Sequence, residues 1–163
     1  MTMRGLALGF ALAAAATAAA CSAPAGPPAT GELRIVSLNP CSDAILAEVA
    51  PDKLVAVSHY SHDPSAGSMP VEEARRWPAT SGSVEEILAA HADMAVASSF
   101  LPPATRAALD QLGIPVVVLG MSNSVEENLA QVRELADAVG EAQAGEALVA
   151  RIETALAAAA PPT

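Results

Sequence analysis

The chain has 163 residues, enough for one domain with a core of its own, and 52% of them are hydrophobic. Only 2% are aromatic, so Val, Leu, Ile and Ala must build that core. The formal net charge of −10 argues against nucleic-acid binding, which requires clustered Lys and Arg. These values are typical of a soluble, exported protein.

The first 20 residues are predicted to be a secretory signal peptide. Arg4 provides a positive start, residues 6–16 are apolar and uncharged, and three Ala residues precede Cys21. A Cys at this place resembles a bacterial lipoprotein site, where Cys21 would carry a lipid anchor; release into the periplasm is the alternative, because Ala18 stands where Leu is usual. Cys41, the only other Cys, is expected to be a small, half-buried residue.

Residues 21–32 are rich in Ala, Pro and Gly and predict a flexible tether, after which the fold begins. Four short apolar runs predict strands, at residues 34–38, 54–57, 93–97 and 115–119. The last of them is apolar on both faces and is expected to be buried on both. The segment over residues 58–81 is expected to be a long irregular loop.

Helices are predicted between and after these strands. Ser42 is expected to cap a helix over residues 43–49, and the tetrapeptide Ser-Val-Glu-Glu forms a capping box at residues 83–86 and again at 124–127. Further helices are expected over residues 102–112, 125–139 and 142–159. The alternation predicts an α/β fold: a parallel sheet of about four strands covered by helices on both faces, followed by a long C-terminal helix.

The carboxyl edge of such a sheet is where ligands usually bind. The loops that leave it here offer mostly uncharged polar and apolar side chains, which suit a large neutral or amphipathic ligand. The candidate binding residues from these loops are Asn39, His59, Tyr60, His62, Ser99, Phe100 and Ser122. His91 lies before the third predicted strand, on the opposite edge, and is expected to be a surface residue.

His59 and His62 allow two interpretations, a metal-ion site or contact with an organic ligand. Neutral imidazoles bind transition metals, yet protein metal sites usually need three or four ligands, so contact with an organic ligand is favoured over a bare-ion site. One His could also supply an axial bond to a haem iron or a corrinoid cobalt. The motifs of nucleotide-binding loops and of the hydrolase nucleophile elbow are absent, so neither enzymatic activity nor a cofactor is expected.

Several motifs, in this order, resemble the amino-terminal lobe of periplasmic substrate-binding proteins of ABC importers, in the class that serves vitamin B12, ferric siderophores and haem. They are Arg-Ile-Val-Ser-Leu-Asn-Pro at residues 34–40, Val-Ser-His-Tyr-Ser-His-Asp-Pro at 57–64, Gly-Ser-Val-Glu-Glu-Ile-Leu at 82–88 leading to Asp-Met-Ala-Val-Ala at 93–97, and Leu-Gly-Ile-Pro-Val at 112–116. The second motif is most similar to the vitamin B12-binding branch. The resemblance covers about residues 33–156.

The resemblance implies roles for three residues. Tyr60 would line the ligand cleft, Trp77 would be a further cleft aromatic, and Glu85 would pair with an Arg of the importer's permease. The implied protein resides in the periplasm and binds a corrinoid, haem or ferric siderophore. A Zn or Mn binder of the same fold, using His59 and His62, is the alternative, as is a fragment or interaction lobe that does not bind a ligand.

The family binds its ligand between two lobes, whereas this sequence covers one. We therefore expect a binding lobe over residues 33–141 and, over residues 142–160, a long helix that would lead to a second lobe not present in this sequence. That helix would expose an apolar stripe of Leu148, Ile152 and Leu156 unless it packs back on the lobe or on another chain.

Overall fold

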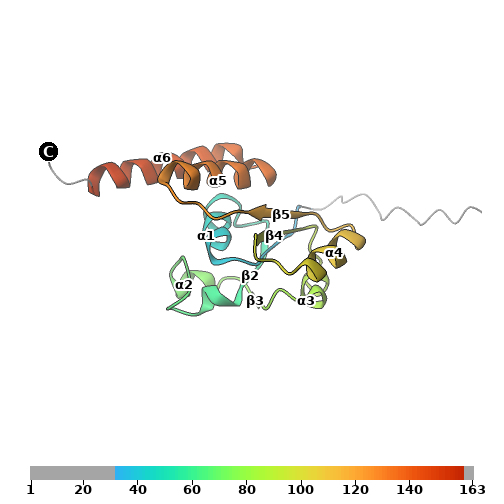
Figure 1. Cartoon of the computed structure of the whole chain (residues 1–163). Coiled ribbons are helices and arrows are strands. Elements are labelled where there is room, and N and C mark those ends of the chain that lie inside the picture. The colour runs from blue at the N-terminus through green and yellow to red at the C-terminus, as the bar shows by residue number, and fades with distance from the viewer. Residues whose placement is uncertain (1–31, 160–163) are drawn as a thin grey trace, which may run out of the picture.

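Short β-branched segments form the centre of the molecule. In a computed structural model, which describes residues 32–159, they build a five-stranded parallel sheet flanked by helices (Figure 1). The strands are β1 (Ile35–Ser37), β2 (Leu54–Ser58), β3 (Ala79–Thr80), β4 (Met94–Ser98) and β5 (Val116–Leu119). The helices are α1 (Pro40–Val49), the 3-10 helix η1 (His59–His62), α2 (Val71–Ala74), α3 (Val84–Ala89), α4 (Pro103–Gln111), α5 (Val125–Ala138) and α6 (Ala142–Ala159).

The strand order is β3-β2-β1-β4-β5, and all neighbours pair in parallel. The chain moves outward from β1 through β2 to β3, then returns to the other side of β1 and moves outward through β4 to β5. The order therefore reverses between β1 and β4, and the loops after these two strands diverge. The predicted α/β class is confirmed, and so is the long C-terminal helix.

Two hydrophobic layers enclose the sheet because successive strand residues point to opposite faces. Ile35 packs with Leu46 of α1 and Leu135 of α5, whereas Val36 packs with Ile87 of α3 and Leu109 of α4. Figure 1 shows α1 and α5 on one face, with α6 beside α5, and α3 and α4 on the other.

The segment over residues 58–81 differs most from the prediction. Instead of one irregular loop it contains η1, α2 and the fifth strand, β3. This strand has only two residues, and its pairing with β2 depends on tertiary contacts, so no local pattern indicates it. His62 and Trp77 help to fold the segment against the lobe, as described below.

Two further predictions need correction. Helix α1 begins at Pro40 rather than residue 43, because Asn39, not Ser42, is the N-cap and accepts a hydrogen bond from the Cys41 backbone. Strand β5 is only half-buried over most of its length, since it lies at the edge of the sheet and not in its interior.

Helix α6 packs back on the lobe over its first half. Leu148 and Val149 join the hydrophobic contacts with α1 and α5, while Leu156 in the second half stays exposed. Two surface ion pairs, Arg133–Glu146 and Arg151–Glu48, link α6 to α5 and to α1. The expected apolar stripe is thus partly covered within the lobe itself.

The predicted signal peptide, Cys21 and all but the last residue of the predicted tether lie outside the described residues, and the domain limits remain predictions. Between residues 32 and 159, no helix combines the length and apolar character needed to cross a bilayer.

Gly145 allows α5 and α6 to approach closely, because an added Cβ at this position would lie 2.4 Å from the Cβ of Ala136. We expect Gly145→Ala to destabilise the protein by about 1–2 kcal/mol: overpacking costs roughly 1–3 kcal/mol, and the higher helix propensity of Ala returns about 1 kcal/mol. Urea denaturation followed by circular dichroism measures the change.

The exchanged pair, Gly145→Ala with Ala136→Gly, is the matched control. It keeps the total helix propensity of the two helices and removes the clash, so its stability should return close to that of the wild type. A double variant as unstable as Gly145→Ala would show that this contact does not set the spacing of α5 and α6.

Candidate functional site

The loops after β1, β2, β4 and β5 meet at the carboxyl edge of the sheet, as predicted. Two hollows lie there, with volumes of about 480 Å³ and about 250 Å³. The larger is lined by residues that include Leu38, Tyr60, Gly82, Ser98, Phe100 and Thr105. The smaller is lined by residues that include Asn39, Cys41, Ser99, Phe100, Met121 and Ser122. Phe100 and Ser98 line both, so the two hollows adjoin at these residues.

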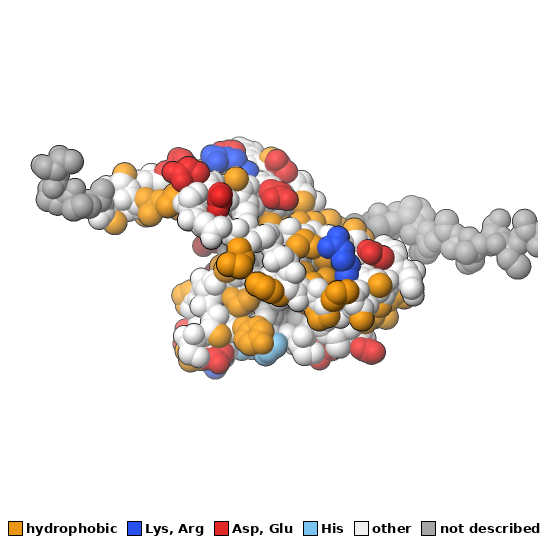
Figure 2. All heavy atoms as spheres, in the orientation of Figure 1, with side chains coloured by type: hydrophobic (Ala, Val, Ile, Leu, Met, Phe, Trp, Pro, Cys, Tyr) orange, Lys and Arg blue, Asp and Glu red, His pale blue; other side chains and the backbone are white. Residues whose placement is uncertain are grey.

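Large apolar side chains stand exposed at this edge. Tyr60 is 53% exposed, Phe100 76% and Met121 69%, and they come from three different loops. Figure 2 shows hydrophobic side chains gathered across the middle of this side of the molecule. Among the described residues that line the two hollows there is no Lys, Arg, Asp or Glu.

Tyr60 and His59 form a pair at the start of η1. Their rings lie 4.0 Å apart between centroids and are tilted by 35°. The His59 Nδ1 lies 3.2 Å from the Thr80 carbonyl oxygen of β3. Because a carbonyl can only accept a hydrogen bond, Nδ1 carries the proton, and the His59 Nε2 of the neutral ring is an acceptor.

The His62 ring points into the lobe and stabilises the fold through hydrogen bonds. Its Nε2 lies 3.2 Å from both the Ala74 and the Trp77 carbonyl oxygens, so Nε2 carries the proton and donates to both. These two hydrogen bonds link η1 to the end of α2 and to the Trp77 backbone. A metal ion could take this nitrogen only if both backbone hydrogen bonds were lost. Over residues 32–159, no group of three or more His, Cys, Asp or Glu residues is placed to hold a metal ion.

The carboxyl group of Asp43 anchors η1, a role that the sequence analysis did not assign. Its Oδ2 accepts hydrogen bonds from the Ser58 backbone N–H at 2.9 Å and from the Ser61 hydroxyl at 2.6 Å. Burial raises the pKa of the Asp43 carboxyl to about 6, against the lowering effect of nearby hydroxyl and amide groups and of His62. The signal in the sequence is an acidic residue on the same face of α1 as Leu46 and Ala47.

The other predicted site residues have different surroundings. Asn39, Ser99 and Ser122 line the smaller hollow, although the Asn39 side chain is also engaged as the cap of α1. Cys41 is exposed there, not half-buried as expected. Trp77 is 7% exposed and packs in the core, with its Nε1 directed at the Pro51 carbonyl. The structure does not bring Trp77 to this surface, because the chain between η1 and β3 folds it under α2.

The two Ser-Val-Glu-Glu segments form similar helix starts. Ser83 accepts a hydrogen bond from the Glu86 backbone, and Ser124 accepts one from the Glu127 backbone. The Glu86 carboxylate also accepts hydrogen bonds from Thr80 and Ser81, which lowers its pKa. Glu85 is exposed, and no other described residue forms a hydrogen bond or ion pair with its side chain.

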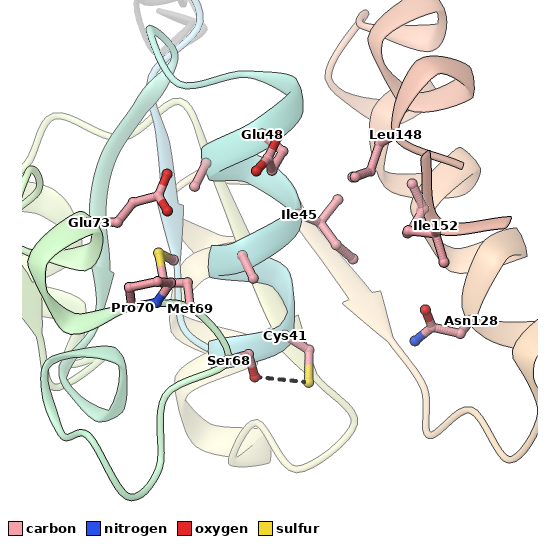
Figure 3. Close-up of a pocket in the computed structure, with 13 residues that line it drawn as sticks. Cys41, Ile45, Glu48, Ser68, Met69, Pro70, Glu73, Asn128, Leu148 and Ile152 are labelled. Atoms are coloured by element: carbon pink, nitrogen blue, oxygen red, sulfur yellow. Dashed lines mark hydrogen bonds between the residues drawn. The ribbon is translucent and has the colours of Figure 1, made fainter. Parts of the chain in front are cut away.

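A third hollow, of about 380 Å³, lies over α1 (Figure 3). Ile45 points toward Leu148 and Ile152 of α6, while Met69 and Pro70 lie on the other side of α1. Cys41 reaches the rim, where its Sγ lies 3.8 Å from the Ser68 hydroxyl. This hollow is mostly apolar and lies between the lobe and α6, beside the two hollows at the carboxyl edge of the sheet.

A family model described as "Periplasmic binding protein" matches residues 35–163. The periplasmic heme-binding protein RhuT from Roseiflexus sp. RS-1 is 26% identical, with a TM-score of 0.62 over 78% of this chain and 49% of its own. The periplasmic vitamin B12 binding protein BtuF of Vibrio cholerae is 26% identical, with a TM-score of 0.57 over 76% of this chain and 48% of its own.

The periplasmic heme binding protein HutB of Vibrio cholerae, at 20% identity, shares the fold, with a TM-score of 0.63 over 82% of this chain and 52% of its own. The chain therefore spans about half the length of these solved structures. None of the curated proteins matches it.

The hydrogen bonds predict opposite neutral tautomers for the two His residues of η1. At pH 8, His59 should carry its proton on Nδ1 and His62 on Nε2, because each of these nitrogens faces only backbone carbonyls. Long-range ¹H–¹⁵N correlation spectra distinguish the two states.

His91 is the internal reference. It is exposed, and its ring forms no hydrogen bond with another described residue, so it should show a mixture of tautomers. The same tautomer at His59 and His62 would contradict the geometry of the turn.

Proposed function

Because this chain belongs to the periplasmic binding protein family, we propose that it is a solute-binding lobe of an ABC importer, and that it binds a corrinoid or an iron-chelate ligand at the carboxyl edge of its sheet. Members of this family bind solutes in the periplasm. The proposal includes export directed by residues 1–20 and either lipid attachment at Cys21 or release. It involves no catalytic step.

One observation carries the proposal: exposed Tyr60, Phe100 and Met121 surround two adjoining hollows whose lining has no charged side chain. Exposed apolar side chains grouped in this way mark binding surfaces, and serine and asparagine side chains among them can fix an orientation. This combination suits the broad face of a macrocycle with polar groups at its margin.

Two relatives support the ligand class. The solved structures at 26% identity are a haem-binding and a vitamin B12-binding protein, and both ligands are metal-bearing macrocycles. Between the two, the absence of Lys and Arg from the described lining favours a corrinoid, since a ligand with exposed carboxylates would leave its charges unpaired. A strongly anionic ferric chelate is disfavoured for the same reason.

The surface is proposed as one wall of a cleft. Small-molecule sites bury most of their ligand, and two open hollows on one edge of a sheet cover a single face of it. The relatives are about twice as long as this chain, which supports a second wall contributed by a further lobe. Affinity measured on this lobe alone should therefore be low.

Tyr60→Ala tests the surface. Removal of this exposed ring should weaken cyanocobalamin binding about tenfold, the size expected when a ring contact worth about 1–2 kcal/mol is lost. Equilibrium dialysis of the purified lobe measures it. Leu112→Ala is the matched control, because Leu112 is also exposed but lies at the end of α4, at the opposite edge of the sheet.

Equal affinity of wild type and Tyr60→Ala would remove Tyr60 from the site. Haem and ferric siderophores, titrated in parallel, assign the ligand class. If Zn or Mn bound tightly through His59 and His62 while no macrocycle bound, the metal-binding alternative would replace the proposal.

Glu85 is proposed to contact the permease. Its carboxylate lies exposed at the first turn of α3 and pairs with no other described residue, so it can meet a cationic side chain of a partner. Glu85→Gln should leave ligand binding unchanged and slow ligand uptake by cells several-fold.

Glu126→Gln is the matched control for Glu85→Gln, since Glu126 occupies the same place in the second Ser-Val-Glu-Glu segment. Equal uptake with both variants would exclude Glu85 from docking. Glu86 is unsuitable for this comparison, because its side chain is needed to hold Thr80 and Ser81.

A further inference from the structure

We propose that Asp43 is a positioning residue that joins the two sides of the candidate ligand surface, and that a proton on its Oδ1 tightens this joint. One side is η1, which carries Tyr60; the other is the start of α1, which lines the smaller hollow through Asn39 and Cys41. The consequence for ligand affinity rests on the proposed function, whereas the joint itself does not.

The contact with η1 is direct. The two donors to Asp43 Oδ2, the Ser58 backbone and the Ser61 hydroxyl, flank His59 and Tyr60 in the chain. Ser58, Ser61 and Asp43 are all buried, so water does not compete for these bonds. One buried carboxyl group therefore binds the residues on either side of His59 and Tyr60.

Asp43 belongs to the first turn of α1, where its backbone N–H donates to the Asn39 carbonyl oxygen at 2.9 Å. The Ser42 hydroxyl donates to the Asn39 carbonyl oxygen at 2.9 Å and so has no second hydrogen to give. The hydrogen bond of 2.8 Å between Ser37 and Ser42 must then have Ser37 as its donor. The only hydrogen of the Ser37 hydroxyl is thereby used, so Ser37 donates no hydrogen bond to Asp43.

This direction of donation leaves Asp43 Oδ1 without a hydrogen-bond donor among the described residues, and Oδ1 is indeed the one buried side-chain atom there without a partner. An ionised Oδ1 thus carries unpaired charge. A proton on Oδ1 removes this charge and leaves both hydrogen bonds to Oδ2 in place. Protonation of Asp43 therefore favours the state in which η1 stays hydrogen-bonded to α1, termed the closed state.

The pH dependence follows from linkage. The carboxyl pKa of Asp43 is about 6 in the folded lobe and 3.8 when exposed, so the closed state binds the proton more tightly than an opened one. The closed state must gain stability as pH falls through 6, and the gain is complete below 3.8. Most carboxyl groups in proteins act in the opposite sense.

The groups around Asp43 are few. Ser37 faces it from β1, Ser58 from β2, and Ser61 and His62 from η1; His62 is the only one that can become charged. A positive His62 would favour the ionised carboxylate and so oppose the proposed effect. On the α6 side, Arg151 pairs with Glu48, which lies five residues along α1 and turned away from Asp43.

Hydrogen exchange of the ligand-free protein tests the joint. Amide protection over residues 58–62, corrected for the intrinsic rate, should rise about tenfold from pH 7.5 to pH 5.0 in the wild type, as the two pKa values require. Asp43→Asn should show high protection at both pH values, because its side-chain carbonyl oxygen can still accept from Ser58 and Ser61 and the side chain has no charge to gain or lose. Asp43→Ala should show low protection at both.

Asp63→Asn is the matched control, since Asp63 directly follows η1, is exposed, and has a pKa lowered by hydrogen bonds from Ser65. It should keep the tenfold rise of the wild type. No rise in the wild type, or the same rise in Asp43→Asn, would overturn the proposal, the latter by assigning the titration to another group.

Ligand affinity provides a separate test of the link between Asp43 and the ligand surface. Cyanocobalamin binding should strengthen from pH 7.5 to pH 5.0 in the wild type and be independent of pH in Asp43→Asn. If exchange shows the tenfold rise while no macrocycle binds, the proposed function fails and the joint stands. Binding that strengthens equally in both proteins would reject the link between Asp43 and the ligand surface.

Discussion

A buried carboxyl group on the apolar face of a helix is costly unless every oxygen finds a partner, and Asp43 is in this position. The hydrogen bonds of Asp43 join the first turn of α1, where it lies, to the end of β2 and to η1, beside the strand ends. An apolar residue there would pack equally well in the core, but it would leave the Ser58 amide and the Ser61 hydroxyl without an acceptor. The arrangement of the candidate surface therefore depends on polar satisfaction at one point and not on packing alone.

The rest of the lobe is a rigid support for the contact between Asp43 and η1. The hydrophobic layers on the two faces of the sheet fix β1 and β4, between which the strand order reverses. Polar loops emerge at that point because the helices on opposite faces diverge, which opens space for Phe100 and its neighbouring hollows.

Much of this fold could be predicted from local patterns, because four of the strands are apolar runs and α5 and α6 have clear periodicity and end signals. What could not be predicted depends on tertiary contacts. Strand β3 exists through its pairing with β2, the Trp77 ring is buried by the fold of residues 59–78, and Asp43 resembles an ordinary helix-start acid until its burial is known. Identical Ser-Val-Glu-Glu segments make the same point: both cap a helix, yet Glu86 binds Thr80 while Glu127 binds the Asn123 backbone.

The shape of the surface limits the affinity that this lobe can provide. The two hollows adjoin at Phe100 and are open to solvent, so a rigid macrocycle would contact Phe100 and both margins while its far face stayed hydrated. Binding also costs translational and rotational freedom, and contacts on one face must exceed that cost before any affinity appears. A firmly held Tyr60 reduces the cost, because less ordering remains to be done on binding. For the proposed one-sided surface, the positioning proposed for Asp43 would therefore matter beside the number of contacts.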